Sequence, residues 1–216
     1  MNRRRSGTGA QERSGAPVSG SATLVPVTDT TPKTVYYTAT TLDGYIADPA
    51  DSLDWLFVQD IDAQGPMNYD EFIAGVGAIA MGATTYEWIR ARIVEGGEKW
   101  SYTVPAVVFT HRDLPRVEGA DLRFTAGDVA SVHAELVAAA DGKDVWVVGG
   151  GDLAGQFADA GLLDEIVASI APVTLGAGRP IFPRRYALRL TELARNGAFA
   201  CARYAVLGPR TTDWSG

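Results

Sequence analysis

VWVVGGGDLAGQF, residues 145–157, joins an apolar run typical of a strand to three glycines and to the start of an amphipathic helix. A glycine turn has no Cβ atoms, so a ligand can lie directly against its backbone. The helix that follows would present unpaired N–H groups and a partial positive charge to that ligand. The alternative is an ordinary strand-to-helix turn, in which the glycines only relieve crowding.

The same glycines match a known nucleotide-binding pattern. Gly149, Gly151 and Ala154 satisfy G-x-G-x-x-A, the fingerprint of dinucleotide-binding Rossmann domains. That fingerprint lies near the start of its domain and is followed by further strands and by an acid about 20 positions on. Here about a third of the chain remains, and the next strand runs into residues 171–173 without an acid. We therefore expect a glycine turn outside a Rossmann domain.

Composition bounds the class of protein. The chain has 216 residues, of which 46% are hydrophobic, enough for one domain with a sizeable core. The formal charge of −7 argues against nucleic acid or an anionic membrane as the main partner. Cys201 has no second cysteine to pair with, and with only two histidines, His111 and His133, no metal cluster is expected. No apolar run approaches the length of a membrane span, and we expect a cytoplasmic protein.

The order of segments predicts an α/β fold. Residues 1–32 are rich in Gly, Ser, Thr and Arg, and we expect a flexible tail there, followed by one domain over residues 33–210. Strand and helix patterns then alternate, which favours a largely parallel sheet with helices on both faces, a three-layer α/β sandwich. The expected strands are Lys33–Thr40, Val76–Gly82, Pro105–Thr110, Ala120–Thr125, Asp144–Gly149 and Asp164–Val173, and the expected helices are Tyr69–Ala74, Thr84–Ile93, Val129–Ala140 and the segment from the glycine turn to Ala160.

The end of the chain predicts a hairpin. Two strand candidates, Tyr186–Arg195 and Ala198–Leu207, flank Asn196-Gly197, a strong hairpin signal. The sheet should therefore be mixed, with an antiparallel hairpin at one edge. We expect Ala198–Leu207 to be an exposed apolar edge strand, which invites pairing with a second copy of the chain.

Two further motifs extend the candidate site. In AIAMGATTYEWI, residues 78–89, a strand ends at Gly82, and Thr84 with Glu87 matches a capping box that opens a helix. Open α/β sheets bind ligands at the carboxyl ends of their strands, so two such turns on one edge indicate a site. In TATTLDGYIAD, residues 38–48, Asp43 and the threonine hydroxyls could bind a carboxamide or a heterocycle, although Asp-Gly is first of all a turn signal.

These motifs, together with GLLDEIVASIAPVTLGAGRPIF at residues 161–182, resemble the dihydrofolate reductase superfamily. The resemblance is to the branch related to the RibD C-terminal domain, the reductase part of the bacterial riboflavin-biosynthesis deaminase-reductase, and covers about residues 33–207. It implies a homodimer and NADPH bound across the carboxyl edge of the sheet. It also implies hydride transfer to a small heterocycle or imine of pteridine or pyrimidine type, as in dihydrofolate or 5-amino-6-(5-phosphoribosylamino)uracil reductases.

Carried over by position, the resemblance implies site residues. Arg112 would meet the adenosine 2′-phosphate, since a guanidinium fork suits a phosphate, although a solvated polar loop is the alternative there. Asp43, and Asp70 or its neighbour Glu71, are the catalytic candidates. The implied cofactor contacts are Thr40, Gly82, Ala83, Thr84, Thr85, Thr110, His111, Arg112, Gly149, Gly150, Gly151, Asp152 and Leu153. Candidates for the substrate wall, or for plain core, are Trp55, Phe57, Met67, Tyr69 and Trp88.

Two positions depart from the resembling reductases. Val148 stands where they usually have a glutamate before the glycine pair, and Tyr45 stands where they have a lysine after Leu-Asp-Gly. These departures keep a second function open, a nucleotide-binding homologue without turnover. A hydrolase has no support, because the chain has no nucleophile motif such as G-x-S-x-G.

Overall fold

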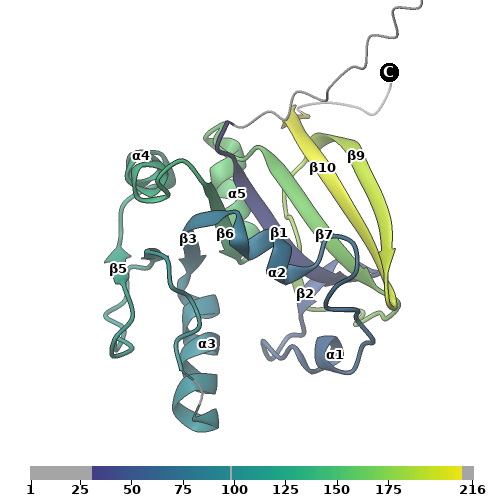
Figure 1. Ribbon diagram of the computed structural model, residues 1–216, viewed down its shortest axis with the longest axis horizontal. Coiled ribbons are helices and arrows are strands. Elements are labelled where there is room, and N and C mark those ends of the chain that lie inside the picture. Colours follow the sequence, from purple (N-terminus) through teal and green to yellow (C-terminus); the bar gives the residue numbers. More distant parts are fainter. Residues whose placement is uncertain (1–30, 98, 211–216) are drawn as a thin grey trace, which may run out of the picture. The chain divides into compact units, whose positions relative to one another are not determined.

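A computed structural model describes residues 31–97 and 99–210, so residues 1–30 of the expected tail lie outside the described part (Figure 1). Within that part, an eight-stranded sheet has the order β5-β4-β3-β6-β1-β7-β10-β9. Its strands are β1 (Thr34–Thr41), β3 (Val76–Gly82), β4 (Ala106–Phe109), β5 (Leu122–Thr125), β6 (Asp144–Gly149), β7 (Glu165–Ala171), β9 (Tyr186–Asn196) and β10 (Phe199–Pro209). Two short strands, β2 (Tyr45–Ala47) and β8 (Arg179–Pro180), pair separately.

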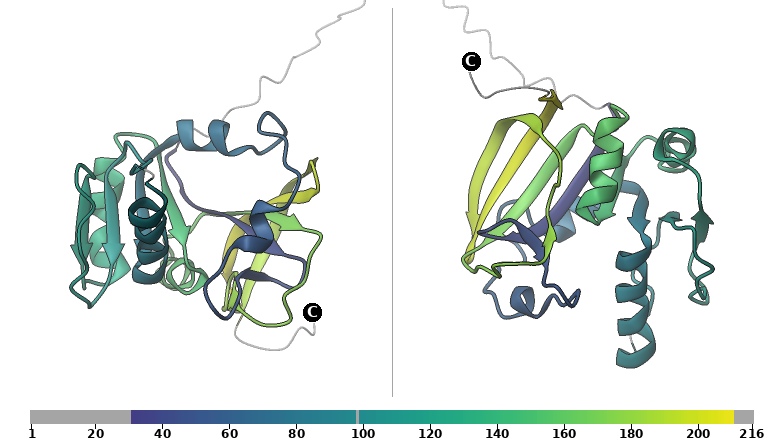
Figure 2. Two further views of the ribbon diagram at one scale, coloured as in Figure 1. Left: turned by 90° about the horizontal axis from the view of Figure 1, so that it is seen from below. Right: turned by 180° about the vertical axis from the view of Figure 1, so that it is seen from behind.

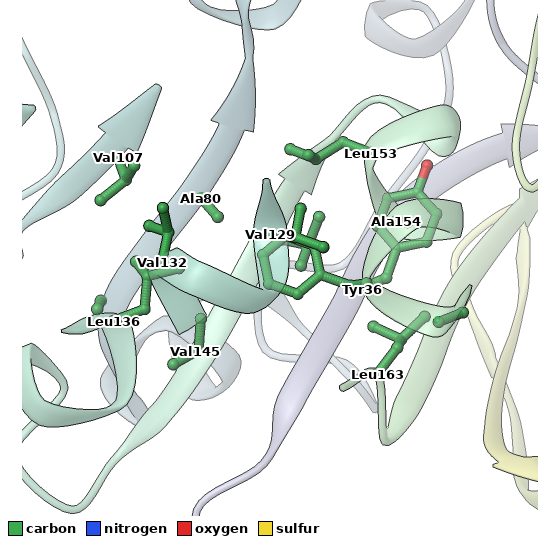
Figure 3. Packing of buried hydrophobic residues seen from close by; sticks show 14 of the residues in the cluster. Tyr36, Ala80, Val107, Val129, Val132, Leu136, Val145, Leu153, Ala154 and Leu163 are labelled. Atoms are coloured by element: carbon green, nitrogen blue, oxygen red, sulfur yellow. The ribbon is translucent and has the colours of Figure 1, made fainter. Parts of the chain in front are cut away.

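Helices cover both faces of the sheet, as the three-layer prediction requires. They are α1 (Asp54–Phe57), α2 (Tyr69–Ala74), α3 (Ala83–Gly96), α4 (Val129–Ala139) and α5 (Gly151–Asp159). Residues of α4 and α5 pack in one core cluster (Figure 3), and residues of α2 and α3 pack in another on the opposite face. Figure 2 shows α5, the green helix in the right-hand view, in front of β1. The alternation of β6 explains the two clusters, because Val145 and Val147 point to one face and Trp146 to the other.

The sheet is mixed, as predicted. The pairs from β5 across to β7 are parallel, whereas β10 is antiparallel to β7 and β9 is antiparallel to β10. One detail of the prediction is wrong: Ala198–Leu207 falls in β10, which lies between β7 and β9, so β9 is the edge strand. The second strand candidate has partners on both sides because the chain turns back outward at the hairpin.

The hairpin turn lies one residue later than Asn196-Gly197 predicts. Asn196 pairs with Phe199, which leaves Gly197-Ala198 as the loop, and Gly197 has a φ of +57°. Asn196 is buried, and its side chain accepts a hydrogen bond from the Asp62 N–H at 2.9 Å and donates one to the Pro66 carbonyl at 3.2 Å. The asparagine is therefore taken out of the turn by its contacts with the segment before α2.

Candidate functional site

A cavity of about 620 Å³ lies at the carboxyl edge of the parallel strands. Its wall includes the segments that follow β3, β4, β5 and β6, the first turns of α3, and residues near β2 and β8. In Figure 1, α3 projects past the end of β3, on the side of the sheet edge where this cavity lies. The fold therefore brings the separate glycine motifs of the sequence to one site.

The turn between β3 and α3 lines the cavity with Gly82, Ala83, Thr84 and Thr85. The prediction of a capping box here is wrong. The helix α3 begins at Ala83, and its N-cap residue is Gly82, so no side chain makes a capping hydrogen bond. Thr84 is therefore already inside the helix, and the Glu87 carboxylate binds Arg112 instead. The helix start consequently offers backbone N–H groups that no capping side chain occupies.

The turn between β6 and α5 lines the cavity with Gly149, Gly150, Gly151, Asp152 and Leu153. The peptide bond between Gly149 and Gly150 is cis. A Cβ added at Gly150 would find its nearest neighbour, the Ile46 side chain, at 3.8 Å, and one at Gly82 would lie 3.7 Å from the Gly149 carbonyl oxygen. A Cβ at Gly151 would lie 2.2 Å from the Ile181 carbonyl oxygen. A Cβ at Gly82 or Gly150 would thus make only ordinary van der Waals contacts, whereas Gly151 relieves crowding.

The three cofactor contacts predicted in the loop after β4 do not all lie at the cavity. Thr110 and His111 line the cavity, but Arg112 is not among the lining residues. The Arg112 guanidinium donates two hydrogen bonds to Glu87 of α3, at 3.1 and 2.6 Å, and both side chains are about half exposed. The acid nearest to Arg112 in the sequence is Asp113, but in the structure the Arg112 guanidinium pairs with Glu87 of α3.

Besides Arg112, three predicted site residues lie away from the cavity wall. Thr40 is buried, and its hydroxyl donates to the Tyr45 carbonyl at 3.1 Å. Asp43 accepts hydrogen bonds from the Thr41 hydroxyl at 2.5 Å and from the backbone N–H groups of Leu175 and Gly176. The hydrogen bond from Thr41 is the main reason that the pKa of Asp43 is lowered. Asp70 lies exposed in the first turn of α2, outside the cavity lining.

Sequence reasoning missed an ion pair in the cavity wall. Asp51 accepts two hydrogen bonds from Arg179, at 2.6 Å from Nε and 3.0 Å from Nη2, and both residues line the cavity. The hydrogen bond from Arg179 lowers the pKa of Asp51 against the opposing effect of partial burial. The two residues are 128 positions apart and lie in short irregular segments, so no periodic pattern could have paired them.

Other side chains in the cavity wall are aromatic, apolar and hydroxylic. Trp88 lines the cavity, as do Thr38, Leu53 and Tyr102, whose pKa is raised by burial. Phe57 stacks on Trp88 at a centroid distance of 6.3 Å, outside the lining, and the other predicted wall candidates, Trp55, Met67 and Tyr69, do not line the cavity. The third strand-to-helix junction, residues 125–127 after β5, also lines it and could have been found by its glycine.

A family model of the RibD C-terminal domain matches residues 32–203. The chain belongs to the RibD C-terminal domain family. Among curated relatives, it is 28% identical over 154 residues to the uncharacterized protein YwjB of Bacillus subtilis strain 168, and the match covers 69% of this chain and 82% of that one.

Two solved structures show the fold of this RibD C-terminal domain protein. A protein from Shewanella sp. PV-4 named for riboflavin biosynthesis has a TM-score of 0.69 at 22% identity, over 81% of this chain and 99% of that one. A diaminohydroxyphosphoribosylaminopyrimidine deaminase/5-amino-6-(5-phosphoribosylamino)uracil reductase from Thermotoga maritima has a TM-score of 0.55 at 17% identity, over 84% of this chain and 58% of that one. The predicted three-layer α/β fold, with a mixed sheet and a C-terminal antiparallel hairpin, is confirmed. No helix within residues 31–97 and 99–210 is long and apolar enough to cross a membrane.

Proposed function

We propose that this protein is an NADPH-dependent reductase that transfers a hydride to a small heterocycle or imine of pteridine or pyrimidine type. The observation that carries the proposal is the cavity, in which two glycine turns that begin helices meet at the carboxyl edge of a parallel sheet. The bound nicotinamide would supply the hydride, and the protein would position the two reactants and exclude water.

The residues of both turns fit a dinucleotide. The backbone N–H groups at the start of α3, with the hydroxyls of Thr84 and Thr85, would hold the pyrophosphate. Residues 149–153 would lie beside the nicotinamide half, and Thr110 and His111 beside the adenosine half. The position of Gly82 and Gly150 in the cavity lining supports this arrangement, because a ligand can lie directly against backbone that has no Cβ.

The acids that line the cavity are poor proton donors. Within the described residues these acids are Asp51 and Asp152. Arg179 lowers the pKa of Asp51, and the hydrogen bond from Gln156 is the main cause of the lowered pKa of Asp152. Both carboxyl groups are therefore ionised at neutral pH. We infer that neither carboxyl group supplies the proton that a substrate needs after hydride transfer.

The second candidate function is a nucleotide-binding homologue of the same fold that does not turn over. Val148 in the cavity wall and Tyr45 in β2 favour it, because each replaces a polar group of the resembling reductases. The placement of Asp43 and Asp70 outside the lining also favours it.

Two measurements on the full chain distinguish these functions. Nucleotide fluorescence gives the dissociation constant of NADPH, and absorbance follows NADPH oxidation with a panel of pteridines, pyrimidines and quinones. We expect binding and oxidation with at least one member. Binding without oxidation would support the second function, and the absence of binding would contradict both.

A further inference from the structure

One part of the cavity wall remains after the proposed cofactor contacts are assigned. It includes Thr38 of β1, Leu53 before α1, Trp88 of α3, Tyr102, and the ion pair near β2 and β8. If the glycine turns hold NADPH, this part faces the substrate. The following inference therefore rests on the proposed function.

The backbone holds the ion pair in place. Ala47 of β2 pairs with Arg179 of β8, and the Asp48 carboxylate accepts hydrogen bonds from the N–H groups of Ala50 and Ser52, at 2.8 Å each. Asp51 lies inside this turn with a φ of +62°, a conformation that Asp and Asn tolerate better than most residues. Local structure therefore holds the backbone of both residues at the cavity wall, and the side chains of Arg179 and Asp51 are 56% and 34% exposed.

In this pair the Asp51 carboxylate offsets the charge of the arginine that lines the wall. Among the described residues that line the cavity, Arg179 is the single lysine or arginine, and its Nε and Nη2 atoms both donate to Asp51. A phosphate would bind Arg179 either by displacing this bidentate carboxylate or at the Nη1 side of the guanidinium, and in both positions it would lie close to the negative charge of Asp51. His111, the other lining residue that can carry a positive charge, follows β4, on the far side of the two glycine turns in the strand order.

The other groups suit an uncharged ring. Trp88 and Tyr102 offer aromatic surface, and the Thr38 hydroxyl, which donates to the Ala39 carbonyl at 3.2 Å, can accept a hydrogen bond. We propose that Asp51, by holding Arg179 and by its own charge, makes this site select planar heterocyclic substrates that carry no phosphate group. Asp51 is in this sense a specificity-determining residue.

Riboflavin and FMN test this inference, because they share one planar ring system and differ only in a phosphate. We would titrate each into the full chain saturated with NADP⁺ and follow flavin fluorescence. We expect the parent protein to bind riboflavin at least about tenfold more tightly than FMN, the scale of one charge-assisted hydrogen bond. In Asp51→Asn, which keeps the shape and tolerates the same φ, the ratio should fall to within about threefold, through tighter FMN binding.

Arg179→Gln is the matched variant, because it leaves the Asp51 charge without its partner. The preference for riboflavin should then widen, whereas damage to the turn alone would move the ratio in the same direction in both variants. A parent that binds FMN as tightly as riboflavin, or an Asp51→Asn variant with an unchanged ratio, would overturn the inference. So would an NADP⁺-loaded parent that binds neither flavin. Failure of the proposed function is separate, since it appears as absent nucleotide binding before any flavin is added.

Discussion

Gly82→Val should remove NADPH binding while the fold stays intact. Gly82 has φ −81° and ψ 164°, which any L-residue adopts. A Cβ there would lie 3.7 Å from the Gly149 carbonyl oxygen and 3.9 Å from the Gly150 nitrogen, which is ordinary van der Waals contact. The two valine methyl groups would then fill the space between the two glycine turns, where we place the cofactor.

The size of the effect follows from the hydrogen bonds to phosphate that the valine would prevent. A hydrogen bond to a charged group contributes about 1.5–3 kcal/mol, so removing one of them weakens binding about 10- to 100-fold. Removing two would make binding undetectable at micromolar nucleotide. Nucleotide fluorescence measures the affinity, and thermal unfolding checks the fold. Gly150→Val should behave similarly, since the nearest atom to its Cβ is 3.8 Å away.

Gly151→Ala is the control, because Gly151 belongs to the same motif and lines the same cavity, but its added Cβ would point at protein backbone. Its Cβ would lie 2.2 Å from the Ile181 carbonyl oxygen and 2.4 Å from that of Pro180. Backbone must move to relieve this contact, at a cost of about 1–3 kcal/mol, which lowers the melting temperature by several degrees. A Gly82→Val protein that titrates NADPH like the parent would refute the site assignment. Equal losses of melting temperature in both variants would refute the division between cavity-facing and protein-facing glycines.

Three further predictions concern residues outside the turns. Arg112→Ala should shrink a preference for NADPH over NADH by about tenfold, because a charge-assisted hydrogen bond from Arg112 to the 2′-phosphate would be lost. Arg112 can leave its exposed pair with Glu87 to make that bond at a cost of at most about 1 kcal/mol. Equal dissociation constants for the two nucleotides in the parent, measured by calorimetry, would contradict this. The protein should be a homodimer that pairs through the edge strand β9. Leu190 of that strand is half exposed in the single chain and would be buried in the dimer, so Leu190→Asp should give a monomer by light scattering. A monomeric parent would exclude this prediction. Glu165→Gln should cost about 1–3 kcal/mol, and the exposed Glu192→Gln under 1 kcal/mol, because Glu165 is nearly buried between two cations. Burial raises the pKa of Glu165, but the hydrogen bonds from these cations outweigh that effect, and the pKa is lowered. The difference in unfolding free energy between the parent and Glu165→Gln should therefore be complete above about pH 5 and shrink as the pH falls below about 4. Denaturant melts measure this difference, and a value independent of pH would refute the prediction.

The regular elements could be predicted because their signals are local. The strands Val76–Gly82 and Asp144–Gly149 and the helix Tyr69–Ala74 have the bounds that the apolar runs and turn residues indicate. The short elements α1, β2 and β8 could not, because two to four residues carry no period. Asp43-Gly44 is a turn, as its dipeptide indicates, but the Asp43 carboxylate binds N–H groups more than 130 positions away, and no local pattern reports such a partner.

The glycines in VVGGGDLAGQF lie against two different parts of the structure, the cavity and residues 180–184. This explains why the motif resembles a Rossmann fingerprint without being one. Gly155 lies inside α5, where glycine costs about 1 kcal/mol relative to alanine. A Cβ there would lie 2.9 Å from the Arg184 side chain, which crosses the helix to bind Asp152 at 3.0 Å and Asp159 at 2.7 Å. Gly151 similarly admits the carbonyl groups just before Arg184. Gly151 and Gly155 are therefore spaced so that residues 180–184 can pack against α5, whereas Gly150 lies in the cavity wall.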